Sequence, residues 1–430
     1  MAQQLFFSRD TKVYIKKGNF VWDLPVLDGF SFSQATNSSE ITLAEMEATG
    51  GVSRRGRKQF NDSLAPAEWS FTTYVRPFTS TGSGTGAADS AAKVHAVEEI
   101  LWALFSGPAA YASSAFTNQT VHDSTDLDID FSESNKATLG TADMFFVLGG
   151  ANRKVYKLKD CVVNEASLDF DIDGIASINW SGMSSEIVDM TSRTITQAAI
   201  PAFNAVVADT SVVSAPSTSH PGGDVWLDSD DGHRLHTILT VPASGNTTVT
   251  GSVYEATNST TNFIRNRLTQ LSVIPTTQNP TGDGSNELES AYAITLTGGN
   301  ITMSNNVTFI TPEEIGLVNV PIGHVTGTRS VSGSMTCYLS KDTTSTDNSA
   351  DLWEDLKSIT SVVTNSFALV FKIGGAASNT ARLEVSMPTC HLEIPTHSIE
   401  DVISVETNFN ALPSTIDGTN EVTLKYFPKV

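Results

Sequence analysis

The segment at 161–182 reads CVVNEASLDFDIDGIASINWSG, and a second segment at 390–411 reads CHLEIPTHSIEDVISVETNFNA. Both begin with cysteine and align without a gap, which places Trp180 on Phe409. Apolar and polar residues alternate in both, which is the pattern of a strand with one buried face. The pair therefore predicts a β-protein with an internal repeat.

Two further matches occur in the same order along the chain. WSFTTYV at 69–75 resembles GSMTCYL at 333–339, and SQATNSSEITLAE at 33–45 resembles TMSNNVTFITPEE at 302–314. A fixed order of several weak matches favours duplication over coincidence. The sequence therefore predicts a mainly β fold with two tandem domains.

Each half also contains one segment with the spacing of an amphipathic helix. Apolar residues recur at three- and four-residue steps at 94–107 and at 348–359. We therefore expect a first domain at 1–200 and a second at 262–430, each with one packed helix. Ser, Thr, Gly and Pro are frequent at 201–261, which indicates a linker or an exposed insertion.

The charge balance limits the classes of partner. The chain has 47 acidic and 26 basic residues, a net charge of -21, which disfavours adhesion to nucleic acid or anionic membranes. DNA can still be a transient cargo. Three widely spaced cysteines, Cys161, Cys337 and Cys390, are interpreted as buried thiols. No signal peptide and no membrane span are expected.

Alternating aspartates mark one predicted strand. Asp169, Asp171 and Asp173 share a strand face, and they are a candidate acidic wall of a channel or an ordinary solvated face. Calcium binding is rejected, because the twelfth position of such a loop is Trp180 and not glutamate. Aspartates at 126, 128 and 130 form a second candidate wall.

The chain shows no catalytic constellation. His233 and His236 lie among aspartates, but we interpret this segment as a polar turn and not as a metal site. No nucleophile elbow and no phosphate-binding loop is present. The sequence therefore predicts no enzyme activity, no cofactor and no metal.

One basic cluster stands out on the acidic chain. Arg54, Arg55, Arg57 and Lys58 lie between two predicted strands, in an exposed loop that could contact an acidic partner surface. A solvated turn or a lateral contact between subunits is the alternative. Binding of single-stranded nucleic acid is disfavoured, because no aromatic residues are interleaved with these charges.

Several segments resemble a known family. KQFNDSLAPAEWSFTTYVRP at 58–77, INWSG at 178–182 and NVTFITPEEIGLVNVPIGHVTGTRSVSGSMTCYL at 306–339 resemble the large, duplicated tail tube protein of flexible-tailed siphophages that infect enterobacteria. The resemblance implies two tail-tube β-sandwich or barrel domains and a homotrimer with six such domains in a pseudo-hexameric ring. Stacked rings would form a hollow conduit for the genome.

The same resemblance implies partners and a location. These are further copies of the chain, a tape measure protein, terminator and tail tip proteins, and a virion tail assembled in the host cytoplasm. It gives the basic cluster a role between stacked rings. The insertion at 202–258 is longer than the family's connection, and we expect no additional immunoglobulin-like domain. A β-sandwich adhesin or receptor-binding virion protein is the alternative function.

Three aromatic residues are expected in the cores. Trp69 and Trp180 belong to the first predicted domain, and Phe409 is the candidate counterpart of Trp180 in the second. Large aromatic side chains dominate the energy of a packed core.

Overall fold

The architecture follows from short strands with alternating burial. The computed structural model describes residues 5–17, 20–42, 57–79, 94–106, 127–131, 139–149, 154–190, 195–197, 210–213, 225–228, 235–240, 247–250, 253–254, 262–275, 291–315, 318–341, 348–358, 367–377, 380–399, 401–416 and 418–429. Antiparallel strands dominate both halves, which confirms the predicted mainly β class. No helix in these ranges is long and apolar enough to cross a membrane.

Within the described residues, the first half contains thirteen strands and one α-helix. They are β1 (Thr11–Lys17), β2 (Phe20–Leu24), β3 (Ser31–Ser33), β4 (Thr36–Thr42), β5 (Arg57–Leu64), β6 (Ala67–Tyr74), β7 (Pro77–Thr79), β8 (Val94–Ala96), α1 (Glu99–Ser106), β9 (Leu127–Asp130), β10 (Ala142–Leu148), β11 (Lys154–Asp171), β12 (Ser177–Ser184) and β13 (Glu186–Asp189).

The segment between the halves also forms strands. β14 (Ile195–Gln197), β15 (Thr210–Val213), β16 (Val225–Asp228), β17 (Leu235–Thr240) and β18 (Thr247–Thr250) make a separate five-stranded sheet. β19 (Val253–Tyr254) pairs with β2 in parallel. This part of the chain therefore has a small sheet of its own, which its Ser, Thr, Gly and Pro content did not predict.

The second half repeats the series. It contains β20 (Gln270–Pro275), β21 (Tyr292–Ile294), β22 (Leu296–Ser304), β23 (Thr308–Ile310), β24 (Gly323–Val325), β25 (Ser330–Tyr338), α3 (Ser349–Ser358), β26 (Phe367–Ile373), β27 (Arg382–Leu392), β28 (Thr396–Ser398), β29 (Ser404–Ala411) and β30 (Thr423–Phe427).

Strand pairing follows one order in both halves. The first half pairs β2-β1-β10-β11-β12-β6-β3, and the second pairs β21-β20-β26-β27-β29-β25-β22. Even a register shift recurs. In the first half it falls between Ala142 and Met144 beside Cys161, and in the second between Phe367 and Leu369 beside Cys390.

The registers correct one detail of the sequence alignment. Phe409 lies opposite Gly333, as Gly182 lies opposite Trp69, so the counterpart of Phe409 is Gly182 and not Trp180. The connection between the paired residues Ser398 and Ser404 is two residues shorter than the connection between the equivalent pair Asp169 and Ser177, which a gapless alignment misses.

The bulky member of this residue pair changes strands between the halves. A Cβ at Gly182 would come within 2.7 Å of the Trp69 ring, and one at Gly333 would come within 2.7 Å of the Phe409 ring. One large aromatic ring is thus kept at this place in the core and a glycine on the facing strand leaves room for it, although neither position keeps its residue.

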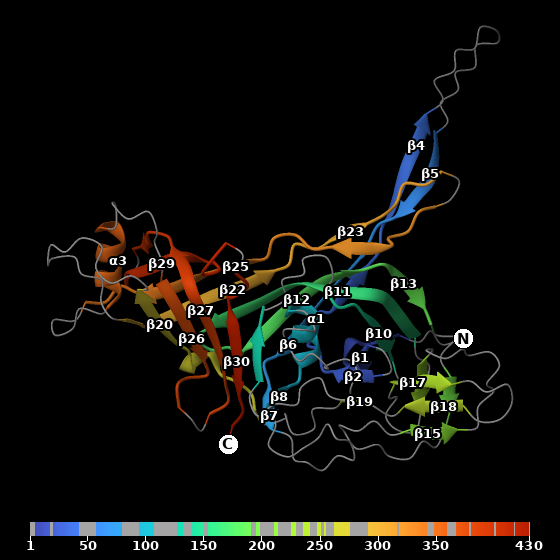
Figure 1. Ribbon diagram of the computed structural model, residues 1–430, viewed down its shortest axis with the longest axis horizontal. Coiled ribbons are helices and arrows are strands. Elements are labelled where there is room, and N and C mark those ends of the chain that lie inside the picture. Colours follow the sequence, from blue (N-terminus) through green and yellow to red (C-terminus); the bar gives the residue numbers. More distant parts are fainter. Residues whose placement is uncertain are drawn as a thin grey trace, which may run out of the picture.

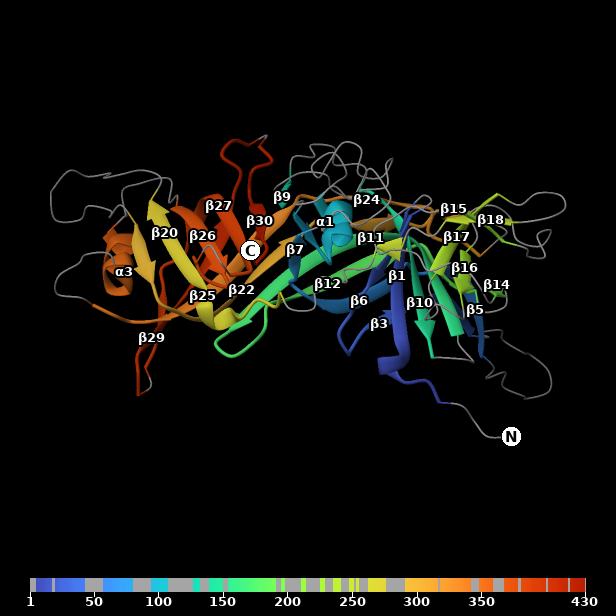
Figure 2. The ribbon, with the colours of Figure 1, turned by 90° about the horizontal axis from the view of Figure 1, so that it is seen from below.

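The two halves form one continuous sheet. The end of β11 pairs with β22, and Figures 1 and 2 show β6, β12, β11, β22 and β25 side by side across the molecule. α1 covers one side of this sheet in Figure 2. It starts five residues later than 94, because Val94–Ala96 forms β8.

The predicted core residues are buried on the helix side of the sheet. Trp69, Trp180 and Phe409 are at most 2% exposed, and the three cysteines are buried free thiols. α3 starts as expected, with Asn348 Oδ1 accepting a hydrogen bond from the Asp351 backbone N–H at 3.4 Å. Leu352 and Leu356 of α3 pack into the same core cluster as α1.

Candidate assembly and channel surfaces

The sheet face opposite the helices is mostly polar. Its side chains alternate with the buried ones and follow from the registers of β3, β6, β12, β11, β22, β25, β29 and β28. They include Ser31, Ser33, Glu68, Ser70, Thr72, Asn179, Ser181, Ser167, Asp169, Asn300, Thr302, Ser332, Ser334, Thr336, Glu406, Asn408, Asn410, Thr396 and Ser398. We call this set the polar face.

The polar face contains hydroxyl, amide and carboxylate groups but no lysine or arginine among the strand residues named for it. Hydroxyl groups bond one another across strands, as between Ser31 and Ser70 at 2.8 Å and between Ser167 and Thr302 at 3.2 Å. Such short side chains satisfy each other and carry no positive charge. A phosphate backbone would find no cation here, so this surface is suited to contact DNA without retaining it.

Only two of the three aspartates of the predicted acidic wall lie on the strand. Asp169 and Asp171 lie exposed at the end of β11, on the polar face. Asp173 lies beyond the strand, because the Asp171 carboxylate accepts the Gly174 backbone N–H at 2.7 Å and closes a turn. Asp173 instead lies 3.6 Å from Arg267. The prediction that three carboxylates share one strand face is therefore wrong for Asp173.

The structure describes only some of the other predicted channel and metal-site residues. Asp128 and Asp130 lie exposed in β9, where Asp128 forms an ion pair with Lys425 at 3.3 Å, while Asp126 is outside the described residues. The loop with His233 is also outside them. No group of three or more metal-ligating side chains is found within the described ranges.

A long hairpin carries the described part of the basic cluster. β4 and β5 project away from the body of the molecule in Figure 1. Arg57 and Lys58 lie exposed where β5 begins, with Arg57 3.4 Å from Glu40 and Lys58 over the Phe60 ring. Arg54 and Arg55 lie outside the described residues. The hairpin therefore presents positive charge at a distance from the sheet.

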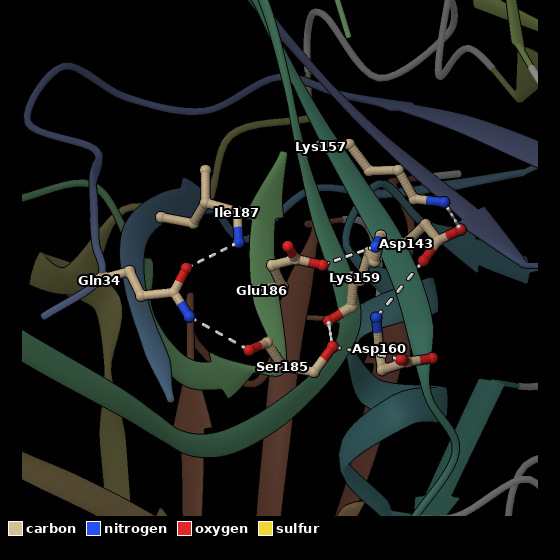
Figure 3. Close-up of polar contacts among 8 residues, drawn as sticks. All are labelled: Gln34, Asp143, Lys157, Lys159, Asp160, Ser185, Glu186 and Ile187. Atoms are coloured by element: carbon tan, nitrogen blue, oxygen red, sulfur yellow. Dashed lines mark hydrogen bonds and ion pairs between the residues drawn. The ribbon is translucent and has the colours of Figure 1, made fainter. Parts of the chain in front are cut away.

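Gln34 forms hydrogen bonds at the base of this hairpin, and Figure 3 shows those to Ser185 and Ile187. Its amide nitrogen donates to the carbonyls of Ala65 at 2.9 Å and Ser185 at 3.2 Å, and its amide oxygen accepts the Ile187 N–H at 3.0 Å. Ion pairs beside it join β13 to β11, with Lys159 2.6 Å from Glu186. These contacts fix the direction in which the hairpin leaves the sheet.

A shorter hairpin of the second half contacts the β4–β5 hairpin. β23 and β24 lead to Asn319, which bridges to Ser63 of β5, and the Leu64 N–H donates to the Asn319 carbonyl at 2.8 Å. Apolar side chains are exposed on both hairpins: Ile41, Phe60, Ile310, Ile315, Val318, Val320, Ile322 and Val325. Exposed apolar side chains gathered on projecting elements are typical of contacts between proteins.

A buried polar network joins α1 to the last strand. The Trp102 Nε1–H donates to the Tyr426 hydroxyl at 2.6 Å, and this hydroxyl donates to Glu98 Oε1 at 2.8 Å. Burial raises the pKa of Glu98 to about 7, because the charged carboxylate loses its hydration. Protonation of Glu98 thus changes a buried contact between the first half and Tyr426 of β30 in the second half.

We expect Glu98→Gln to stabilise the subunit at alkaline pH. The folded-state pKa of Glu98 is about 7 and its unfolded value is 4.5, so wild type loses stability as pH rises from 4.5 to 7. Above pH 7 the variant should gain about 3 kcal/mol in unfolding free energy, and near pH 4.5 it should gain nothing. Denaturant titration at both pH values measures this. Glu68→Gln on the polar face is the matched control, and an equal gain at both pH values would contradict the assignment.

Sequence reasoning missed most of the polar face. Serine and asparagine at alternate positions of 300–304 and 330–336 were visible, but a face spanning both halves appears only when β11 pairs with β22. The signal that could have found it is the lack of lysine and arginine from 163–171 of β11 and from β3, β6, β12, β22, β25, β28 and β29.

Fold and surfaces together define a class. The chain is a β-rich structural subunit with two equivalent halves in one sheet, a polar face without basic side chains, and projecting hairpins with exposed apolar residues. Comparison with known proteins identifies a protein that is similar to this chain. The tail tube protein pb6 of Escherichia phage T5 is 26% identical over the whole chain, which covers 77% of that protein. No protein-family profile matches the chain. The similarity confirms the predicted resemblance to siphophage tail tube proteins.

Proposed function

We propose that the chain is the structural subunit of a phage tail tube, which polymerises into stacked rings around a channel for DNA. The observation that carries this proposal is the polar face, which spans both halves and contains no lysine or arginine among its strand residues. The similarity to a tail tube protein supports it independently.

Within this function, the polar face lines the channel. A duplex that moves through a tube must not be held by counterion release, so the wall must lack cations. Serine, threonine and asparagine side chains keep the wall hydrated, and Asp169, Asp171 and Glu406 repel phosphates. The helices then lie on the outer side, over the core.

Three copies close each ring in this proposal, so that six equivalent half-subunits surround the channel. The repeated strand order supports a first tube domain at 1–200 and a second at 262–430, with the segment 201–261 as an outer insertion. The projecting β4–β5 hairpin with Arg54, Arg55, Arg57 and Lys58 contacts the neighbouring ring, whose net charge is negative.

The role is mechanical and not enzymatic. A tape measure protein sets the length of the tube, terminator and tail tip proteins bind its ends, and DNA passes as a cargo without specific binding. Assembly takes place in the cytoplasm of the host, and the assembled protein is located in the virion tail.

Single cysteines on the two sides of the sheet test the assignment of the channel. Ser334→Cys lies on the polar face, and Lys341→Cys lies beside Asp351 of α3. In assembled tubes, a maleimide on a large globular protein should label only the Lys341→Cys variant, while both variants should react in dissociated subunits. Labelling of the Ser334→Cys variant in tubes would contradict the proposal.

A further inference from the structure

Among the described strands, one strand of the second half has no neighbour on the edge where its counterpart in the first half has one. The end of β11 lies between two strands, with β12 on one edge and β22 on the other, where 165–171 pair with 298–304. Its counterpart is the end of β27 continued by β28. β28 pairs with β29 on one edge, and no strand of the described residues pairs with its other edge.

The missing neighbour has a counterpart in the first half. β22 corresponds to β3, because both lie next to equivalent strands, β25 and β6. β3 pairs only with β6 among the described strands. Within the described residues, β3 and β28 thus each have one open edge, and each edge matches one side of the junction that β11 and β22 form within the chain.

We propose that β28 of one copy pairs antiparallel with β3 of the next copy and so repeats the β11–β22 junction between subunits. This inference rests on the proposed tube function and specifies the surface that closes its rings. Pairing would bond the open backbone groups of both strands, which otherwise invite uncontrolled aggregation.

The strand registers predict which residues meet. Ser167 lies opposite Thr302 within the chain, and their hydroxyl oxygens are 3.2 Å apart. The equivalent positions are Thr396 and Ser33, which are both exposed and again carry hydroxyl groups. The hydroxyl pair is thus retained with its two residue types exchanged between the strands.

The aromatic contact beneath the junction is matched as well. Phe170 is 5% exposed and lies 5.5 Å from Phe371 of the second half, over Gly299, where a Cβ would come within 2.8 Å of the ring. These three residues correspond to Ile399, Phe146 and Phe30.

Phe30 stacks on Phe146 at 5.5 Å and so fills the place that Phe170 occupies in the second half. The opposing residue is Ile399, which stands in place of Phe170. Ile399 is 81% exposed in the isolated subunit. Phe30 and Ile399 are thus two apolar residues at facing positions, as the buried centre of an interface requires.

Paired cysteines test the junction. In assembled tubes, oxidised Ser33→Cys with Thr396→Cys should link copies covalently into dimers and closed rings that a reductant separates. Each single variant should give none. Ser167→Cys with Thr302→Cys is the matched control, since it should link strands within one chain. Burial raises the pKa of the native Cys337 to about 11 and of Cys390 to about 12, so these thiols stay protonated.

Tubes in which the control pair links but the Ser33–Thr396 pair does not would overturn this junction and leave the tube function intact. Failure of the wild type to form tubes would instead remove the proposed function and this inference with it. If the paired variant does not assemble, the Thr396→Cys single variant tests the junction instead. Its reaction with a small maleimide should fall several-fold on assembly, and an unchanged rate would overturn the junction.

Discussion

Replacing Ile399 by aspartate is expected to abolish tube formation while leaving the subunit folded. Ile399 is 81% exposed in the isolated subunit, so a carboxylate costs little there. In the proposed junction the same carboxylate would be buried against Phe30 of the next copy without a cation, which costs several kcal/mol at every interface of a ring. Sedimentation should show subunits only, with an unchanged thermal transition.

Ser398→Asp is the matched control for this variant. Ser398 is the exposed neighbour on the polar face, and its counterpart in the first half is Asp169. The first half thus already carries a carboxylate at this position. Normal tubes from Ser398→Asp and none from Ile399→Asp would locate the effect at the apolar side of the junction. Normal tubes from both variants would contradict it.

Replacing Trp180 by alanine is expected to cost about 3 to 5 kcal/mol in unfolding free energy. Trp180 is fully buried, its ring lies 4.8 Å from that of Trp102, and its Nε1–H donates to Thr73 Oγ1 at 2.9 Å. The variant would leave a cavity between the sheet and α1 and an unpaired buried hydroxyl group. Denaturant titration of unassembled subunits measures the loss.

Asn179→Ala provides the comparison, because Asn179 is the preceding residue on the exposed polar face and its side chain accepts a hydrogen bond from Thr72 Oγ1 at 3.4 Å. Its cost should be within about 0.5 kcal/mol of zero. Equal stability of both variants would show that the helix side of the sheet is not the core.

The packing explains why the halves retain so little common sequence. Trp69 with Gly182 corresponds to Gly333 with Phe409, and Phe170 with Gly299 corresponds to Ile399 with Phe30. In the first case the bulky residue moves to the facing strand, and in the second isoleucine replaces phenylalanine while phenylalanine replaces glycine. Equivalent positions of the two halves can therefore differ in residue type while the strand pairing stays the same.

Local patterns predicted the strands and helices because alternation and capping act over a few residues. Cys161 and Cys390 located equivalent strands, and Asn348 located the start of α3. The shorter turn before β29 was not predictable, since a two-residue change keeps the alternation intact. The end of β11 at Asp171 also depends on a local turn that competes with the strand.

The candidate surfaces were harder to predict than the elements. Asp169 and Asp171 were recognised, but the polar face needs eight strands from both halves, whose neighbours are set by long-range pairing. The open edges of β3 and β28 are properties of the sheet, and no single segment encodes them.

Negative-stain electron microscopy of the purified, concentrated protein tests the central claim most directly. The account predicts hollow tubes, or rings with three-fold symmetry and six lobes around an open channel. Discrete particles without a channel, persisting at high concentration and in the presence of purified tail tip complexes, would contradict it.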